Sequence, residues 1–216
     1  PVIALLIVVL TMLFSAISFG CCIMYAVRFY KNLFTDEGYI TWTLPASPLT
    51  QLWAKILSAS IWYVLDLTIC FAAAWFLISG DNIQSALERI KPDFQAALGM
   101  SFSSFCSLVV FFSFVGIVSC VLFIYTSIAI GQLVPAHRII VSIAVYFILN
   151  LIIQIVTIGV SIITSVFPDY VFSPAQTSFS EYFFQTLLIG TCTTTVLAIA
   201  GYFITYRILQ RKVNLI

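Results

Sequence analysis

The sequence predicts an all-α membrane protein, a polytopic bundle of helices, and composition and charge pattern carry that prediction. Apolar residues make up 62% of the 216 residues, and charged residues make up only 8%. Soluble domains carry on the order of three times as many charges. The few charges gather between five apolar segments, each reaching the roughly 20 residues that a membrane-spanning helix needs. We therefore expect a single transmembrane domain over residues 1–216.

The five predicted spans are joined by an elbow, a short turn and two outer loops. The spans lie near residues 2–27, 52–78, 102–134, 139–167 and 182–209. The elbow covers residues 28–51, and the outer loops cover residues 79–101 and 168–181. The second outer loop is rich in aromatic residues and either dips into the outer leaflet or stays solvated, anchored by its rings.

The distribution of lysine and arginine predicts which ends face the cytoplasm, because cytoplasmic loops carry an excess of both. With the elbow inside, only Arg89 and Lys91 lie outside, and the C-terminus is cytoplasmic. The basic residues at inner ends are then Arg28, Lys31, Lys55, Arg138, Arg207, Arg211 and Lys212.

The start of the chain, Pro1 followed directly by an apolar run, falls on the outer side in this orientation. We expect one further span ahead of it, which would return the N-terminus to the cytoplasm and give six spans. The alternative is a cleaved signal peptide ahead of five spans.

The elbow predicts a short helix along the membrane surface, from about Thr35 to Leu44. Thr35 is expected to cap this helix. Asp36 and Glu37 occupy its first turn, where carboxylates favour the positive end of the helix dipole. Since Leu44 precedes Pro45, the helix should end there.

Two further helix boundaries follow from local sequence. Ser47 followed by Pro48 predicts the N-cap and first position of the next helix. In the first outer loop, apolar residues recur at helical spacing after Asp81, a candidate N-cap. We expect Lys91 and Pro92 to close that outer helix.

Asp66 is the only acid well inside a predicted span, and such groups are by default functional candidates. No basic residue lies within a helical turn or two of it along the chain, so its partner must come from another helix or from water. Asp66 either handles substrate or protons, or lines a wet cavity or bonds to Ser or Thr to fix packing.

The fourth predicted span carries a polar stripe along one helix face. Its members recur at steps of four, three and four residues: Asn150, Gln154, Thr157 and Ser161, continued by Thr164. Such a stripe should face protein or a water-filled path. It forms either a hydrogen-bonded seam between helices or the lining of a translocation path.

Several functional classes lack the residues that they need. The chain has no GxxxxGK[ST] phosphate loop, so we do not expect it to hydrolyse ATP itself, and HExxH and GxSxG are missing too. The six cysteines all lie in predicted spans without metal-ligand spacing and should pack as small apolar residues. We expect no catalytic site, cofactor or metal in this chain, and no nucleic-acid partner, because its charges form no basic face.

The elbow run YKNLFTDEGYITWTLPASPLTQLWAKIL, residues 30–57, resembles the cytoplasmic loop between the second and third spans of type-2 ATP-binding-cassette (ABC) exporter permeases. The likeness lies in an acidic pair, then Thr-Leu-Pro, a Ser-Pro start and a lysine before the next span. It is most similar to the bacterial branch associated with peptide antibiotics and lantibiotics. Ala54 stands where that family has glycine, and beyond the elbow the resemblance extends only to topology and to Gly131-Gln132-Leu133.

The resemblance implies a six-span permease in the bacterial plasma membrane, with both termini inside. The surface helix would then be a coupling helix that docks on a separate cytoplasmic ABC ATPase subunit, which would hold ATP and magnesium. A second permease copy or paralogue would complete a dimer, and a peptide, lantibiotic or other amphipathic antimicrobial would pass between the two. The residues expected to dock are Asp36, Glu37, Tyr39 and Trp42; for the two aromatics the alternative is anchoring in the lipid headgroups.

Two other functions stay open at this point. An ion-driven secondary transporter would use Asp66 and the stripe that begins with Asn150 and Gln154, although no internal repeat is visible. A membrane scaffold or sensor subunit would bind a partner and move nothing.

Overall fold

The computed structural model describes residues 2–43, 45–78, 81–166 and 179–211, and all the secondary structure in them is helical. The elements are α1 (Val2–Phe34), α2 (Asp36–Thr43), α3 (Pro48–Ile78), α4 (Asp81–Leu98), α5 (Phe102–Gly131), the 3₁₀ turn η1 (Pro135–His137), α6 (Arg138–Ile163) and α8 (Phe179–Arg211). Five of these helices, α1, α3, α5, α6 and α8, are long and apolar enough to cross a membrane. The predicted all-α membrane architecture is confirmed at this level.

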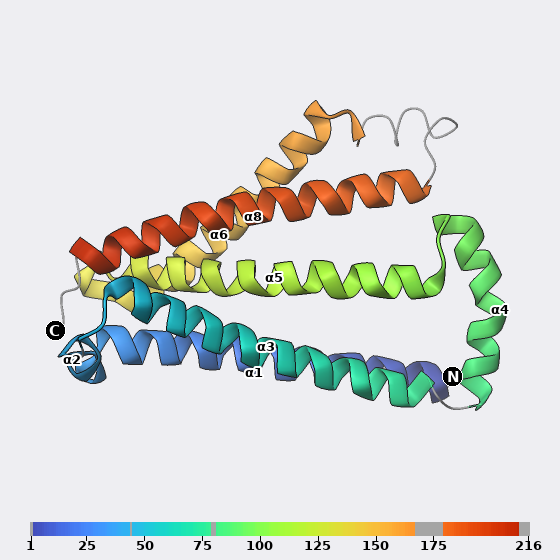
Figure 1. Cartoon of the computed structure of the whole chain (residues 1–216), viewed down its shortest axis with the longest axis horizontal. Helices are drawn as coiled ribbons and strands as arrows, with labels where there is room; N and C mark the ends of the chain where they lie inside the picture. The colour runs from blue at the N-terminus through green and yellow to red at the C-terminus, as the bar shows by residue number, and fades with distance from the viewer. Residues whose placement is uncertain (1, 44, 79–80, 167–178, 212–216) are drawn as a thin grey trace.

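The five long helices run back and forth between two ends of the molecule (Figure 1). The elbow end holds α2, the turn between α5 and α6, and the C-terminal end of α8. The opposite end, the α4 end, is crossed by the amphipathic helix α4. Lys31, Lys55, Arg138 and Arg207 therefore belong to the elbow end, and Arg89 and Lys91 to the α4 end.

α5 is the central helix of the bundle and packs against α1, α3, α6 and α8. Its buried residues all fall between Ile117 and Gly131, the half nearer the elbow end. The main apolar core lies beside that half and includes Phe29, Leu52 and Tyr125. α8 approaches α5 closely there, and the buried Thr205 hydroxyl donates to Thr126 Oγ1 over 3.1 Å.

The outer helix α4 is longer than the sequence predicted. It continues through Pro92, which was expected to close it, and ends at Leu98. The additional turns place the ring of Phe94 against those of Phe102 and Phe105, and Leu98 is buried. This tertiary packing compensates for the backbone hydrogen bond that proline removes.

Part of the predicted outer loop falls outside the described residues. The structure leaves residues 167–178 undescribed, so the choice between a loop that dips into the membrane and a solvated loop stays a prediction.

Candidate functional site

The short helix α2 is fastened between α1 and α3 at the elbow end (Figure 1). The buried Gln51 side chain of α3 donates from Nε2 to the Thr41 carbonyl oxygen over 2.9 Å. On the α1 side, the Asn32 amide lies between Glu37 and Lys55. With its nitrogen toward Glu37 and its oxygen toward Lys55, the Asn32 amide donates to Glu37 Oε2 over 3.1 Å and accepts from Lys55 Nζ over 2.6 Å. A displacement of α2 therefore acts on both neighbouring spans.

The outward side of α2 combines acidic and apolar surface. Asp36 and Glu37 are exposed, and Ile40 is 72% exposed. The side chains of Tyr39 and Trp42 lie outside the part of the chain that the structure describes, so their role in docking stays a prediction. The described side chains of α2 therefore form a small exposed amphipathic surface at the elbow end.

The two predicted helix caps in the elbow had different outcomes. Ser47 caps α3 as predicted, because Thr50 N donates to Ser47 Oγ over 3.2 Å. The Thr35 side chain does not cap α2, and that prediction was wrong. Its hydroxyl donates to the Lys31 carbonyl oxygen over 2.6 Å, and its backbone carbonyl accepts from Gly38 N over 2.7 Å. The hydroxyl is directed to one of the unpaired carbonyls at the end of α1, and among the described residues no backbone N–H group of α2 donates to its oxygen.

Asp66 of α3 is half-buried and has a partner on another helix. Ser18 of α1 donates from Oγ to Asp66 Oδ2 over 2.7 Å. The bond joins two spans, as the packing role of this carboxylate requires. The role in substrate or proton handling stays a prediction.

We expect Asp66→Asn to leave stability nearly unchanged, because an amide oxygen can accept the same hydrogen bond from Ser18. Ser18→Ala should lower the free energy of unfolding by about 0.6 kcal/mol, the mean for hydrogen bonds between membrane helices. Reversible unfolding in mixed micelles measures both. A clear loss of stability in Asp66→Asn would show that the negative charge is needed and that the hydrogen bond alone does not account for the role of Asp66.

The polar stripe of α6 does not form one continuous lining. Thr157 Oγ1 lies 2.9 Å from Thr193 Oγ1 of α8, which makes an interhelical contact at the centre of the stripe. Ser161 is buried and donates to the Thr157 carbonyl oxygen over 2.9 Å. Asn150 donates to a carbonyl one turn back on its own helix, and Gln154 is exposed. The stripe includes a seam at Thr157, and its use as a translocation path stays a prediction.

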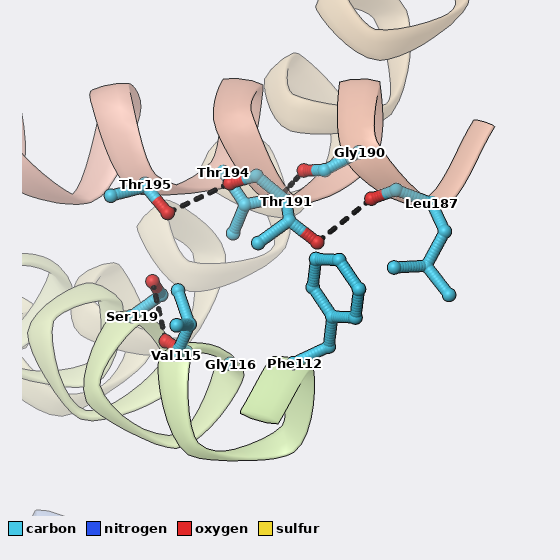
Figure 2. A pocket seen from close by; sticks show the side chains of 9 residues that line it. All are labelled: Phe112, Val115, Gly116, Ser119, Leu187, Gly190, Thr191, Thr194 and Thr195. Carbon is cyan, nitrogen blue, oxygen red and sulfur yellow. Dashed lines mark hydrogen bonds between the residues drawn. The ribbon is translucent and has the colours of Figure 1, made fainter. Parts of the chain in front are cut away.

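A groove of about 200 Å³ opens between α5 and α8 near the middle of both helices (Figure 2). On α5 it lies at the border between the buried half, to which Ser119 belongs, and the half without buried residues. The residues that line it are Phe112, Val115, Gly116 and Ser119 from α5, and Leu187, Gly190, Thr191, Thr194 and Thr195 from α8.

The hydroxyl groups in this groove are available only as hydrogen-bond acceptors. Each one already donates its proton to a carbonyl of its own helix: Thr191 to Leu187, Thr194 to Gly190, Thr195 to Thr191 and Ser119 to Val115, over 2.6–3.0 Å. Their oxygens keep free lone pairs. With the ring of Phe112 opposite, the groove suits an amphipathic molecule that carries N–H donors.

The sequence prediction missed this groove, although one signal for it was available. Residues 191–195 hold four threonines in five positions inside a predicted span. Which helix they face depends on how α8 packs against α5. That packing is set by the whole bundle and not by the local run.

The cysteines follow the predicted packing role in part. Cys21, Cys22 and Cys120 pack against the main core, whereas Cys106 and Cys192 are exposed at the surface of the helices. All six are free thiols. Within the described ranges, no three His, Cys, Asp or Glu side chains come together as a metal site.

Comparisons with known protein families, with characterised proteins and with solved structures find no match for this chain.

Proposed function

We propose that this chain is the membrane-spanning permease subunit of an ATP-driven ABC exporter. The proposal rests mainly on α2. This short helix lies outside the candidate spans, and its Asp36 and Ile40 side chains are exposed. The same helix is bonded to α1 through Asn32 and to α3 through Gln51. A helix with these two properties suits the transmission of force from an external subunit to two membrane spans.

In this proposal a separate cytoplasmic ATPase subunit binds α2 and holds the ATP and magnesium. Closure of two such ATPase subunits moves α2. The bond from Gln51 to Thr41 carries the motion into α3, and the Asn32 bridge carries it into α1. Substrate leaves between two permeases, and the complex lies in a bacterial plasma membrane with the C-terminus of this chain inside.

The proposed substrate is a peptide, a lantibiotic or another amphipathic antimicrobial. The groove between α5 and α8 supports this class, because it sets hydroxyl acceptors beside aromatic and aliphatic surface. Peptide N–H groups supply matching donors. Removal of such a compound from the membrane would serve export or self-protection.

The described contacts give less support to the two other functions. A secondary transporter that uses Asp66 would need a carboxylate that exchanges partners, and here Ser18 already holds it. The Gln154 side chain, another residue of that hypothesis, is exposed on α6. A scaffold that moves nothing would not need a surface helix bonded to two spans.

The test compares Asp36→Arg plus Ile40→Ser with the unmodified chain. We expect the ATPase subunit to co-purify with the unmodified chain in mild detergent and to be lost from the variant, because the variant reverses a charge and removes an apolar contact on the docking surface. ATP hydrolysis stimulated by substrate should fall with it.

The matched control is Glu88→Arg plus Ile90→Ser on α4. This control also reverses one acidic charge and replaces one isoleucine by serine, on exposed residues of the amphipathic helix at the opposite end. Equal loss of the ATPase in both variants, or no nucleotide-hydrolysing subunit with the unmodified chain, would contradict the proposed function.

A further inference from the structure

A polar pocket of about 260 Å³ lies between α1, α3 and α5 at the elbow end. Two basic side chains line it, Arg28 from α1 and Lys55 from α3, together with the polar side chains of Asn32 and Ser58. Neither the docking surface on α2 nor the groove between α5 and α8 includes this pocket.

The wall of the pocket is rigid where it meets the core. Phe29 and Tyr125, which also line it, stack with their ring centroids 3.8 Å apart and their planes 9° apart. Tyr125 is fixed further by a hydrogen bond from its hydroxyl to the Lys55 carbonyl oxygen over 3.1 Å. The backbone that carries Lys55 is therefore held in place beside the pocket.

The pocket carries an uncompensated positive charge. The guanidinium of Arg28 is exposed and makes no hydrogen bond or ion pair with the residues that the structure describes. The acid near Lys55 is Glu37. The Asn32 amide lies between the two side chains and bonds to both, and Glu37 does not line the pocket. Two positive charges against one carboxylate leave one positive charge without a partner.

The position of the pocket points to the ligand. Arg28 lies within the last two turns of α1, and Lys55 lies about two turns after the start of α3, so both sit at the elbow end of these candidate spans. Trp62, two helical turns further along α3, also lines the pocket and is half exposed. Basic pockets between membrane helices at this depth suit anionic lipid headgroups, and a guanidinium binds phosphate oxygens in pairs.

We propose that this pocket binds the phosphate group of an anionic phospholipid from the leaflet at the elbow end. Arg28 and Lys55 hold the phosphate, and the acyl chains run past Trp62 along the exposed apolar faces of α1 and α3. The bound phosphate competes with the Asn32 and Glu37 pair for Lys55. Lipid occupancy therefore acts on one of the two bonds that fasten α2.

The test measures lipid retained by the full chain in mixed micelles, with native mass spectrometry. The probes are phosphatidylglycerol and phosphatidylcholine with identical acyl chains. We expect one phosphatidylglycerol to be retained per chain in preference to phosphatidylcholine. Arg28→Gln plus Lys55→Gln should weaken that binding roughly 30-fold, from the contribution of two basic groups near a membrane surface.

Two further variants separate a bound site from general surface charge. Lys31→Gln plus Arg207→Gln removes the same charge from exposed residues at the same end, outside the pocket, and should retain the lipid. Glu37→Gln should strengthen binding, because it removes the one carboxylate that draws on Lys55.

Loss of fold is controlled by Arg28→Lys plus Lys55→Arg, which keeps both charges and should keep the lipid. Equal loss of phosphatidylglycerol from the pocket variant, Arg28→Gln plus Lys55→Gln, and from the surface variant, Lys31→Gln plus Arg207→Gln, would overturn the proposal. Binding of inorganic phosphate at the pocket without retention of phosphatidylglycerol would assign the site to a soluble anion and overturn the lipid assignment. No ATPase enters the readout, so this proposal and the proposed function fail separately.

Discussion

Phe29→Ala should lower the free energy of unfolding by about 3–5 kcal/mol, the usual cost of emptying a buried phenylalanine site. Phe29 is 1% exposed and lies in the main core at the elbow end. Its ring stacks on Tyr125, so the change removes that contact as well as leaving a cavity. Reversible unfolding in mixed micelles, followed by loss of helicity, measures the cost.

The control for this change is Phe19→Ala on the same helix. Phe19 is 67% exposed, and in a membrane its neighbours are acyl chains. Lipid fills the space that the smaller side chain leaves, because acyl chains are as apolar as the ring that they replace. Equal costs at the two positions would contradict the placement of the core at the elbow end.

Gly131→Ala should cost about 3 kcal/mol, the upper part of the range for overpacked sites. Gly131 ends α5 where the chain turns into α6. A Cβ atom there would lie 2.0 Å from Ser142 Oγ, 2.8 Å from Ser142 N and 2.9 Å from the Arg138 carbonyl oxygen. Two of these atoms belong to the backbone of α6, so a rotamer change cannot relieve the clash.

Two companion variants test that explanation by the same unfolding measurement. Gly159→Ala on α6 meets nothing within 4 Å and should be neutral or slightly stabilising, since alanine favours a helix over glycine. Adding Ser142→Ala to Gly131→Ala should recover only part of the loss, because the backbone contacts remain. Full recovery would show that the side chain alone limits the approach of α6 to α5.

The parts of the fold that depend on local sequence could be predicted, and the elbow shows why. The helix expected from about Thr35 to Leu44 runs from Asp36 to Thr43, and the Ser47 cap is present. Pro45 and the acidic pair act on their immediate neighbours, so their effects do not depend on the rest of the bundle. Even here the prediction for Thr35 failed, because its hydroxyl donates to the Lys31 carbonyl oxygen one turn back and does not cap α2.

The parts that depend on packing could not be predicted. Spacing placed Asn150 to Ser161 on one face of α6, but spacing does not say where another helix meets that face. α6 runs at an angle to α8 (Figure 1), and α8 contacts the stripe at Thr157 but leaves Gln154 exposed. In the same way, nothing in the separate sequences around Arg28 and Lys55 says that they share one pocket.

The uneven distribution of buried residues along α5 has a mechanical consequence. Between Ile117 and Gly131 the helix is held from several sides, while no residue between Phe102 and Gly116 is buried. Helices held more tightly at one end separate by pivoting, so small rotations about the elbow end become larger displacements at the α4 end, where α4 and the contact between Phe105 and Phe183 limit them. Such a rotation would widen the far half of the bundle while the core between Phe29 and Tyr125 stays intact.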